Sequence, residues 1–305
     1  MTPGAGKNLA ASVQHRLLQF AQRTQEEHQL VLMRYGLERL LFRLSLSPYA
    51  NEFVVKGAMM FLVWKGEAYR ATKDLDLLSL QSGTVERFGN WFRELCRVEV
   101  EEDGLVLLPE SVRAEVIRED EAYQGVRVRL EARLGKSKIP LQVDIGFGDA
   151  VTPKARKAGF PTLLGSPAPQ LAMYPMETAI AEKFEALVSL GILNSRMKDF
   201  YDLWVMSREF EFDGAALAAA ITATFKRRKT PLPEGAPFAL TDKFGNDPTK
   251  REQWRAFVKR GRLKLVEPNL MTVLEAVRDF LLTVVAATAG GGKFKAHWPK
   301  GGPWQ

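Results

Sequence analysis

The chain has 305 residues, of which 46% are hydrophobic and 26% are charged, a composition typical of a soluble globular protein with one large domain or two ordinary ones. It has no apolar run of the roughly 20 residues that cross a bilayer, and its start lacks the pattern of a secretion signal. The single cysteine, Cys96, cannot form an internal disulfide, and the three histidines are scattered. We therefore expect a cytoplasmic protein without a membrane partner, and hydrolases built on a Ser/His/Asp or Cys/His pair are disfavoured. The formal net charge of +7 favours an anionic partner such as RNA.

Helices and then strands are predicted over the first 80 residues. Apolar residues recur at helical spacing along residues 8–45, which we interpret as two helices that cover a sheet. Val54 and Val55 indicate a short strand, Gly57 breaks it, and residues 58–64 are an apolar run of good helix formers. Residues 72–78 then have the pattern of a second strand.

Two aspartates share one face of this second strand. Side chains two apart in a strand project from the same face, so Asp74 and Asp76 stand about 6.7 Å apart along the backbone. Leu75 and Leu77 point the other way, into the core. Two carboxylates on one face suit a hard cation such as Mg²⁺. The alternative is that both acids are merely the solvated face of a half-buried strand.

The residues around this pair suit phosphate. A strand, a Gly turn and a helix place backbone N–H groups and a helix N-terminus at one end of the sheet, where phosphate binds favourably. Arg70 and Lys73 add positive charge beside the acids. Nucleotidyl or phosphoryl transfer needs phosphate-binding and metal-binding groups together, so the stretch points to that chemistry.

The middle of the chain adds strands and a third acid. Three segments with alternating apolar and charged residues are interpreted as antiparallel additions to the sheet: residues 112–119, 124–133 and 139–149. Asp144 lies between Val143 and Ile145, and an acid in that setting is expected to need a partner or a metal. Asp149 is the competing candidate, although after Gly148 it also fits a turn.

A lysine and two acids stand out beyond a loop-rich connection at residues 151–174. In the helix predicted over residues 176–190, Lys183 lies within the apolar stripe, where a lysine must extend to solvent, meet a buried acid or reach a ligand. Asp199 and Asp202 are three residues apart and share one side of the next helix. Asp199 could also serve only the dipole at the start of that helix.

Two segments near the C-terminal end are left open. Residues 250–264 hold seven basic residues against the single acid Glu252, together with Trp254 and Phe257. This pattern fits either a surface that holds an RNA backbone and stacks a base, or a helix with one solvated face. The Gly- and Trp-rich tail at residues 289–305 is either flexible or docked through its indoles.

The motifs resemble those of the AbiEii/AbiGii toxin family of bacterial toxin–antitoxin and abortive-infection systems, within the polymerase beta-like nucleotidyltransferase superfamily. The family carries Lys-Gly-Gly or Lys-Gly-Ala and then Arg-x-Thr-x-Asp-Leu/Ile-Asp, matched here by residues 56–58 and 70–76. It also carries Ala-Glu-Lys-x-x-Ala-Leu and Arg-x-Lys-Asp-Phe-Tyr-Asp-Leu, matched by residues 181–187 and 196–203. The superfamily's usual Gly-Ser is replaced by Gly57-Ala58, which removes a hydroxyl often used on phosphate.

The resemblance implies an α+β fold, with a nucleotidyltransferase-like mixed or antiparallel sheet under a helical cover, followed by a mostly helical C-terminal half. Residues 1–150 would form the nucleotidyltransferase core with its N-terminal helices. Residues 151–305 would form a helical domain that completes the active site and ends in the tail at residues 289–305.

The resemblance also implies a Mg²⁺-dependent toxin that transfers nucleotides from an NTP to the 3′ end of tRNA and so blocks translation, with an antitoxin encoded nearby as its partner. The implied catalytic residues are Asp74, Asp76, Asp144, Lys183, Asp199 and Asp202, of which the first three would also bind the metal. The implied nucleotide- and phosphate-binding residues are Lys56, Gly57, Ala58, Arg70, Lys73 and Arg196. The alternatives are a nucleotidyltransferase that modifies a protein hydroxyl and an inactive RNA- or nucleotide-binding module.

Overall fold

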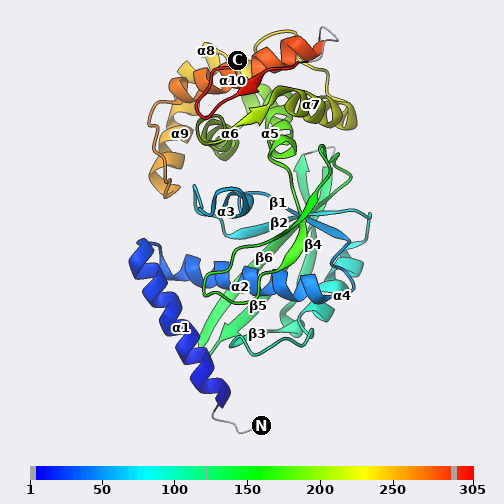
Figure 1. The fold of residues 1–305 in the computed structure, drawn as a ribbon, viewed down its shortest axis with the longest axis vertical. Coiled ribbons are helices and arrows are strands. Elements are labelled where there is room, and N and C mark those ends of the chain that lie inside the picture. The colour runs from blue at the N-terminus through cyan, green and yellow to red at the C-terminus, as the bar shows by residue number, and fades with distance from the viewer. Residues whose placement is uncertain (1–4, 121–122, 290–293) are drawn as a thin grey trace. The chain divides into compact units, whose positions relative to one another are not determined.

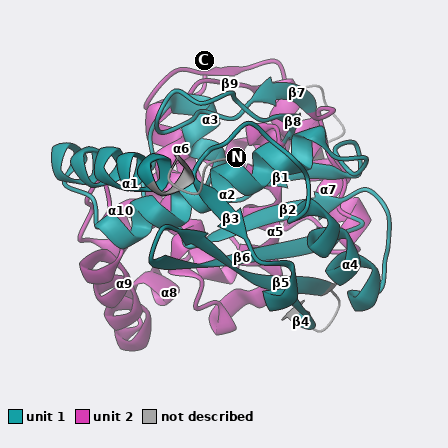
Figure 2. Cartoon of the chain, turned by 90° about the horizontal axis from the view of Figure 1, so that it is seen from below, with its two compact units in different colours: residues 1–148, 156–173 teal, residues 149–155, 174–305 magenta. Residues whose placement is uncertain are grey.

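The computed structural model describes residues 5–120, 123–289 and 294–305, and the chain forms two compact units (Figure 2). Unit 1 comprises residues 1–148 and 156–173, and unit 2 comprises residues 149–155 and 174–305. The predicted division after residue 150 falls in the short segment where the chain first enters unit 2. Over the described ranges, no helix is both long and apolar enough to span a membrane.

Unit 1 is built on a mixed sheet with the strand order β3-β5-β6-β2-β1-β8-β7, in which β4 also pairs with β5 (Figure 1). The strands are β1 (Phe53–Lys56), β2 (Asp74–Ser79), β3 (Leu105–Leu107), β4 (Arg113–Asp120), β5 (Tyr123–Leu134), β6 (Ser137–Phe147), β7 (Arg156–Gly159) and β8 (Gln170–Met173). The two strands predicted around Gly57 and the three predicted further along are confirmed as β1, β2, β4, β5 and β6.

Two features of the sheet differ from the prediction. β6 pairs with β5 antiparallel but with β2 parallel, so it is not a purely antiparallel addition. The alternation of residues decides which face a side chain occupies but not the direction of the strand. In addition, residues 151–174 are not only a connection, because β7 and β8 lie within them and β8 pairs parallel with β1.

Helices cover one face of this sheet. The helices of unit 1 are α1 (Ala5–Thr24), α2 (His28–Leu46), α3 (Met60–Lys65) and α4 (Val85–Leu95), with the short 3₁₀ turn η1 (Pro109–Ser111). Gly36 of α2 lies directly against Leu141 of β6, and Phe88 and Phe92 of α4 meet Phe53 of β1. The residues of β2 and β6 that point to these helices are fully buried, Leu75, Leu77, Val143 and Ile145 among them. The predicted helical cover is therefore confirmed, and the opposite face of the sheet carries the acids.

Unit 2 is mostly helical. Its helices are α5 (Met176–Leu190), α6 (Met197–Glu209), α7 (Gly214–Arg228), α8 (Asp242–Asn246), α9 (Pro248–Arg260) and α10 (Leu270–Ala289), with the 3₁₀ turns η2 (Gly191–Leu193) and η3 (Phe238–Leu240). Two short strands, β9 (Phe212–Asp213) and β10 (His297–Trp298), pair antiparallel. Together the two units confirm the predicted α+β class.

The described part of the C-terminal tail is docked on unit 2. The indole N–H of Trp298 donates to the carbonyl of Ser207, and that of Trp304 donates to the carbonyl of Phe280, each at 2.8 Å. The Trp304 ring also stacks on Phe280, with centroids 5.9 Å apart. Residues 294–305 therefore take the docked form of the two that the sequence left open, whereas residues 290–293 lie outside the described part of the chain.

Candidate active site

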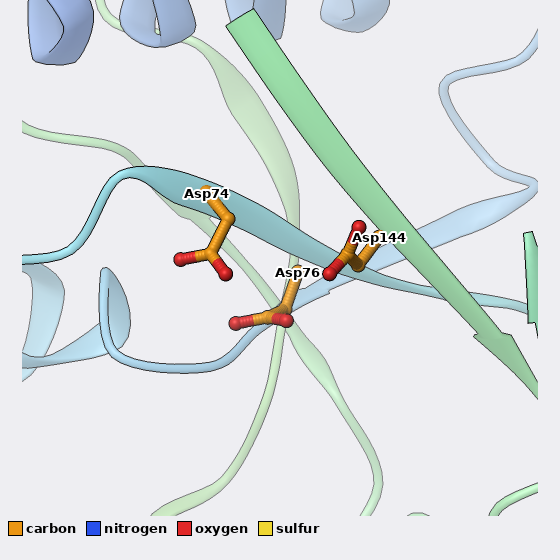
Figure 3. A group of neighbouring side chains, drawn as sticks. All are labelled: Asp74, Asp76 and Asp144. Carbon is orange, nitrogen blue, oxygen red and sulfur yellow. The ribbon is translucent and has the colours of Figure 1, made fainter. Parts of the chain in front are cut away.

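Three aspartates converge on the face of the unit 1 sheet that lies opposite α2 and α4 (Figure 3). Asp74 and Asp76 lie on β2, and the parallel register of β2 with β6 places Asp144 directly beside Asp76. Each of the three offers a carboxylate oxygen, and these oxygens all lie within 4.8 Å of one another. Asp74 and Asp76 are half-buried and Asp144 is buried. We call these three residues the acidic triad.

Gly57 is required by the position of the triad. The residue has φ +78°, a conformation that side chains disfavour. An ideal Cβ at this position would also lie only 1.9 Å from Oδ2 of Asp76. Because Lys56 is paired with Asp76 in the β1–β2 register, the turn at Gly57 brings the backbone of β1 onto the Asp76 carboxylate. Any side chain here would displace that carboxylate.

The other predicted phosphate-binding residues of unit 1 flank the same turn and strand. Ala58 is buried, and the helix that follows the turn, α3, starts at Met60 and has six residues, so it is shorter than the predicted run. Arg70 is half-buried and Lys73, directly before Asp74, is exposed. Between them, the Thr72 hydroxyl donates to Oδ1 of Asp74 at 2.7 Å, which orients that carboxylate.

Arg127 is a residue of the site that sequence reasoning missed. Its guanidinium Nε and Nη2 donate to Oδ1 and Oδ2 of Asp144, each at 2.7 Å. The signal was present in the hairpin between β5 and β6. Counting outward from the tight turn at Gly135 and Lys136, where Leu134 pairs with Ser137, places Arg127 opposite Asp144. Without that register, Arg127 resembles any charged residue on a solvated strand face.

Asp149, the competing candidate, has a different setting. It belongs to unit 2, where its Oδ1 lies 3.0 Å from Nη2 of Arg228 on α7. The same arginine also pairs with Glu185 of α5 at 2.7 Å. Asp149 therefore joins the start of unit 2 to its helices. Among the described residues, the third acid of the group with Asp74 and Asp76 is Asp144 and not Asp149.

A second cluster of predicted residues forms within unit 2. The Lys183 ammonium on α5 lies 2.7 Å from Oδ1 of Asp199 and 2.8 Å from Oδ2 of Asp202, both on α6. The Arg196 Nε lies 2.8 Å from the other oxygen of Asp199. The side chains of Asp199 and Asp202 are 1% and 0% exposed, whereas that of Lys183 is 17% exposed. We call these four residues the lysine cluster.

The charges in this cluster decide the state of Asp199. Burial alone raises the pKa of that carboxyl, but the positive charges of Lys183 and Arg196 outweigh it, so the pKa of Asp199 is lowered from its ordinary value. Asp199 and Lys183 are therefore both charged at neutral pH, and the contacts with Asp199 and Asp202 fix the direction of the lysine ammonium. The sequence left three possibilities for Lys183, which were solvent, a buried acid or a ligand. In the structure, its ammonium meets two buried acids.

A family model named "Nucleotidyl transferase AbiEii toxin, Type IV TA system" matches residues 39–276 of the chain. The chain belongs to the AbiEii family. This AbiEii protein is thus a nucleotidyltransferase, as the motifs around Gly57, Asp74 and Lys183 indicated, and it belongs to a toxin–antitoxin family. No curated protein matches it.

Two solved structures are similar to the AbiEii protein. One is a candidate nucleotidyltransferase from H. pylori, with 15% sequence identity, a TM-score of 0.47, and coverage of 87% of this chain and 94% of that one. The other is JHP933 from Helicobacter pylori, with 16% identity, a TM-score of 0.46, and coverage of 87% and 91%. Since both TM-scores lie below 0.5, the family assignment rests on the family model.

The acidic triad of the AbiEii protein fits a hard divalent cation. Its donors are all carboxylate oxygens, which Mg²⁺ and similar ions prefer over nitrogen or sulfur. The close approach of the Gly57 backbone to Asp76, the hydroxyl of Thr72 on Asp74 and the guanidinium of Arg127 on Asp144 fix these donors from three sides.

The basic segment at residues 250–264 corresponds to α9 and the loop after it. Trp254 is 1% exposed, and its indole N–H donates to the carbonyl of Glu267 at 3.0 Å. Its ring also packs against Phe257, with centroids 5.5 Å apart. Trp254 therefore cannot stack a nucleic-acid base in this conformation. Of the two interpretations, a helix with one solvated face, carrying Arg251, Arg255 and Lys259, agrees with the structure.

Proposed function

We propose that this AbiEii protein is a Mg²⁺-dependent toxin that transfers nucleotides from an NTP to the 3′ end of tRNA. The observation that carries the proposal is the convergence of Asp74, Asp76 and Asp144 on one face of the sheet, from two strands that are far apart in the sequence. A solvated strand face explains two neighbouring acids but does not explain a third acid brought beside them by a parallel register.

In this proposal the triad binds the divalent cation. When bound, the cation would neutralise the charge of the triphosphate and of the leaving pyrophosphate. Asp74 and Asp76 are the principal ligands, since they are the more open of the three carboxylates. Asp144 completes the ligand set or accepts the proton of the attacking 3′-hydroxyl.

Cations and backbone groups near the triad would hold the phosphates. The residues proposed for this are Lys56, Gly57, Ala58, Arg70 and Lys73 of unit 1. A phosphate contact is proposed separately for Arg196 in unit 2. The missing hydroxyl at position 58 would be replaced by backbone N–H groups of the Gly57 turn, where φ is +78°. Lys73 is exposed, so its ammonium can reach a phosphate from the solvent side.

The lysine cluster of unit 2 is proposed to take part in nucleotide transfer. Lys183 contacts phosphate, and Asp199 and Asp202 orient it. The support is the geometry within unit 2, where two fully buried carboxylates flank the Lys183 ammonium, whose side chain is 17% exposed. Two buried acids that serve one lysine are an arrangement that stability alone does not require, because buried ion pairs are often no more stable than apolar packing.

The acceptor and the partner follow from family membership and charge. We propose tRNA as acceptor because the protein belongs to a type IV toxin–antitoxin family and carries a net charge of +7, which favours an RNA partner. Extra nucleotides at the 3′ end would prevent aminoacylation and so stop translation. A cognate antitoxin, encoded nearby, is the proposed partner that controls the enzyme.

Transfer of labelled nucleotide tests the proposal directly. The purified protein is incubated with Mg²⁺ and each of four α-labelled NTPs, in the presence of total tRNA or of total protein. Label on tRNA, lost on chelation of the metal and in the Asp76→Asn variant, is the expected result. Glu86→Gln, which removes an exposed carboxylate of α4 in the same unit, is the matched control and should keep full activity.

The other outcomes separate the alternatives. Label on protein would replace tRNA by a protein hydroxyl as the acceptor. The absence of label from both would favour a binding module without catalysis. Expression in a bacterial host completes the test, since growth should stop with the wild-type chain and continue with Asp76→Asn at the same protein level. Harmless expression of the wild type would remove the toxin assignment of this chain.

A further inference from the structure

Arg127 holds one of the three acids of the triad in a fixed orientation. Its Nε and Nη2 bind the two oxygens of Asp144 side by side at equal distances of 2.7 Å. The two residues are direct partners in the β5–β6 ladder, so the strands themselves keep the pair together. The Asp144 side chain is only 9% exposed, whereas Arg127 is 27% exposed. The arginine thus forms part of the open surface of the site, and the carboxylate lies beneath it.

This contact leaves Asp144 able to act as a ligand. An ionised carboxylate has about four lone-pair positions, and a two-pronged guanidinium occupies one on each oxygen. The Gln142 amide also donates to Oδ2, at 3.5 Å. The positions that remain are available to a cation, and one Asp144 oxygen lies within 4.8 Å of those offered by Asp74 and Asp76. Because both oxygens are held, the plane of the carboxylate cannot rotate. Its free lone pairs therefore keep one direction.

The same contact places a permanent positive charge beside the cation site. An arginine remains protonated at any physiological pH. This charge repels a divalent cation in the triad. Arg127 thus has two opposite effects on the site: it orients Asp144 as a ligand, and its charge repels the cation.

We propose that Arg127 is a positioning residue, whose forked contact fixes Asp144 for nucleotide transfer while its charge weakens the binding of the divalent cation. The inference rests on the proposed function, because it assumes that the triad binds the cation used in catalysis. It differs from a purely structural role in one respect. A structural arginine would affect stability, whereas Arg127 should affect metal affinity and turnover in opposite directions.

Two substitutions separate the fork from the charge. Arg127→Lys keeps the charge but cannot form the two-pronged contact, and Arg127→Gln removes the charge as well. Arg129 offers a matched control, since it lies two residues along β5 on the same face and pairs with Glu115 at 2.5 Å. Arg129→Gln removes a strand arginine without touching Asp144. Thermal unfolding of each variant establishes that it is folded.

Mn²⁺ serves as the probe, and its binding is followed by electron paramagnetic resonance in the absence of nucleotide. We expect Arg127→Gln to bind Mn²⁺ about 3- to 30-fold more tightly than the wild type, and Arg127→Lys to bind it about as tightly as the wild type. At saturating Mn²⁺, both variants should show a kcat for nucleotide transfer that is lower by about 10- to 100-fold. Arg129→Gln should change neither quantity by more than about twofold.

Each result decides a defined part of the inference. Unchanged or weaker Mn²⁺ binding by Arg127→Gln would overturn the effect of charge, and an undiminished kcat for Arg127→Lys would overturn the positioning role. If the wild type binds no Mn²⁺, or if the Asp74→Asn variant binds Mn²⁺ as tightly as the wild type does, the metal part of the proposed function fails together with the inference. If the wild type binds Mn²⁺ at the triad but transfers no nucleotide, the proposed function and the positioning role fail, and the affinity measurement still decides the effect of charge.

Discussion

The acidic triad of unit 1 and the lysine cluster of unit 2 both gather carboxylates, but they present opposite charges to the solvent. In the triad, the carboxylates of Asp74 and Asp76 are themselves the accessible groups. In the cluster, the carboxylates of Asp199 and Asp202 are fully buried, and the more accessible side chains are the cations Lys183 and Arg196. Aspartate therefore has two roles in this chain: in the triad it is an accessible anion, and in the cluster it is a buried partner of a cation.

The acidic triad and the lysine cluster therefore depend on charge balance in different ways. A buried carboxylate costs several kcal/mol unless a cation pairs with it, so the two acids of the cluster need Lys183 and Lys183 needs them. In the triad, Asp74 and Asp76 are half-buried and in reach of solvent, and the buried Asp144 is paired with Arg127, so these acids do not depend on a buried cation. Neutralising an acid should thus remove activity in unit 1 and stability in unit 2. Four substitutions test this contrast.

The largest expected effect is that of Asp76→Asn on catalysis. Loss of one principal ligand should lower kcat/KM for nucleotide transfer by about 10³-fold or more, equivalent to about 4 kcal/mol. The free energy of unfolding should change by less than about 1 kcal/mol, because the side chain remains in contact with water. Activity assays with urea denaturation measure both. A large loss of stability would place Asp76 in the same class as the buried acids.

Asp202→Ala should have the reverse pattern. Removing one acid leaves Lys183 with a single carboxylate partner in a buried setting, which should lower the free energy of unfolding by about 3 kcal/mol. Urea denaturation measures this loss, and activity should fall with it because the ammonium is no longer fixed. Asp279→Asn, an exposed acid on α10 in the same unit, is the control and should change stability by less than about 0.5 kcal/mol.

Gly57→Ala tests whether geometry alone can disable the triad while every carboxylate remains. The new methyl group would collide with the Asp76 side chain and would occupy a left-handed backbone conformation. The backbone term should cost about 1–2 kcal/mol of stability, and displacement of Asp76 should lower kcat by about 10²-fold. Mn²⁺ affinity reports the displaced ligand separately. Activity at the wild-type level would mean that the close contact is not needed.

The smallest effect concerns pH and the buried acid Glu38, whose ion pair with Arg39 at 3.3 Å does not offset the effect of burial on its pKa. Glu38 of α2 is 0% exposed and accepts a hydrogen bond from the Leu163 N–H, and burial raises its pKa from 4.5 to about 7. A raised pKa means that the folded state binds the proton more strongly, so stability falls as pH rises through about 7. We expect unit 1 to lose about 2 kcal/mol between pH 5 and pH 8, and Glu38→Gln to remove this dependence in thermal melts.

The pH behaviour of the lysine cluster has the opposite sign. The lowered pKa of Asp199 gives stability that is present above its ordinary value of 3.8 and is lost as pH falls below it. Acidification below about pH 4 should therefore weaken unit 2, and a rise from pH 5 to pH 8 should weaken unit 1. If both units lost stability at the same end of the pH range, the contrast between paired and poorly paired acids would not hold.

The sequence predicted the parts of the site that depend on local periodicity. The two-residue period of β2 put Asp74 and Asp76 on one face, and the apolar stripe of α5 marked Lys183 as a lysine that needs a partner. The three-residue spacing of Asp199 and Asp202 put both acids on the same side of α6. These relations are set within one element, so neighbouring residues are sufficient to reveal them.

What the sequence did not reveal depends on relations between elements. The parallel direction of β6 along β2 and the pairing of β8 with β1 follow from how the chain returns to the sheet. The segment that holds β7 and β8 contains four prolines, at positions 153, 161, 167 and 169, and they give it the appearance of a connection. The contact of Arg127 with Asp144 needs the register of a hairpin, which alternation alone does not fix.

The docked tail gives unit 2 an optical signal of its own. Trp298 and Trp304 pack with Phe280, and Trp204 and Trp254 are also buried in this unit, so four of the six tryptophans lie within it. Indole fluorescence moves to longer wavelength when the ring passes from an apolar environment into water. With Trp64 and Trp91 of unit 1 replaced by phenylalanine, the emission of the chain would follow the melting of unit 2 alone. Comparison with circular dichroism, which senses the helices and strands of both units, would then show whether the two halves unfold in one step or in two.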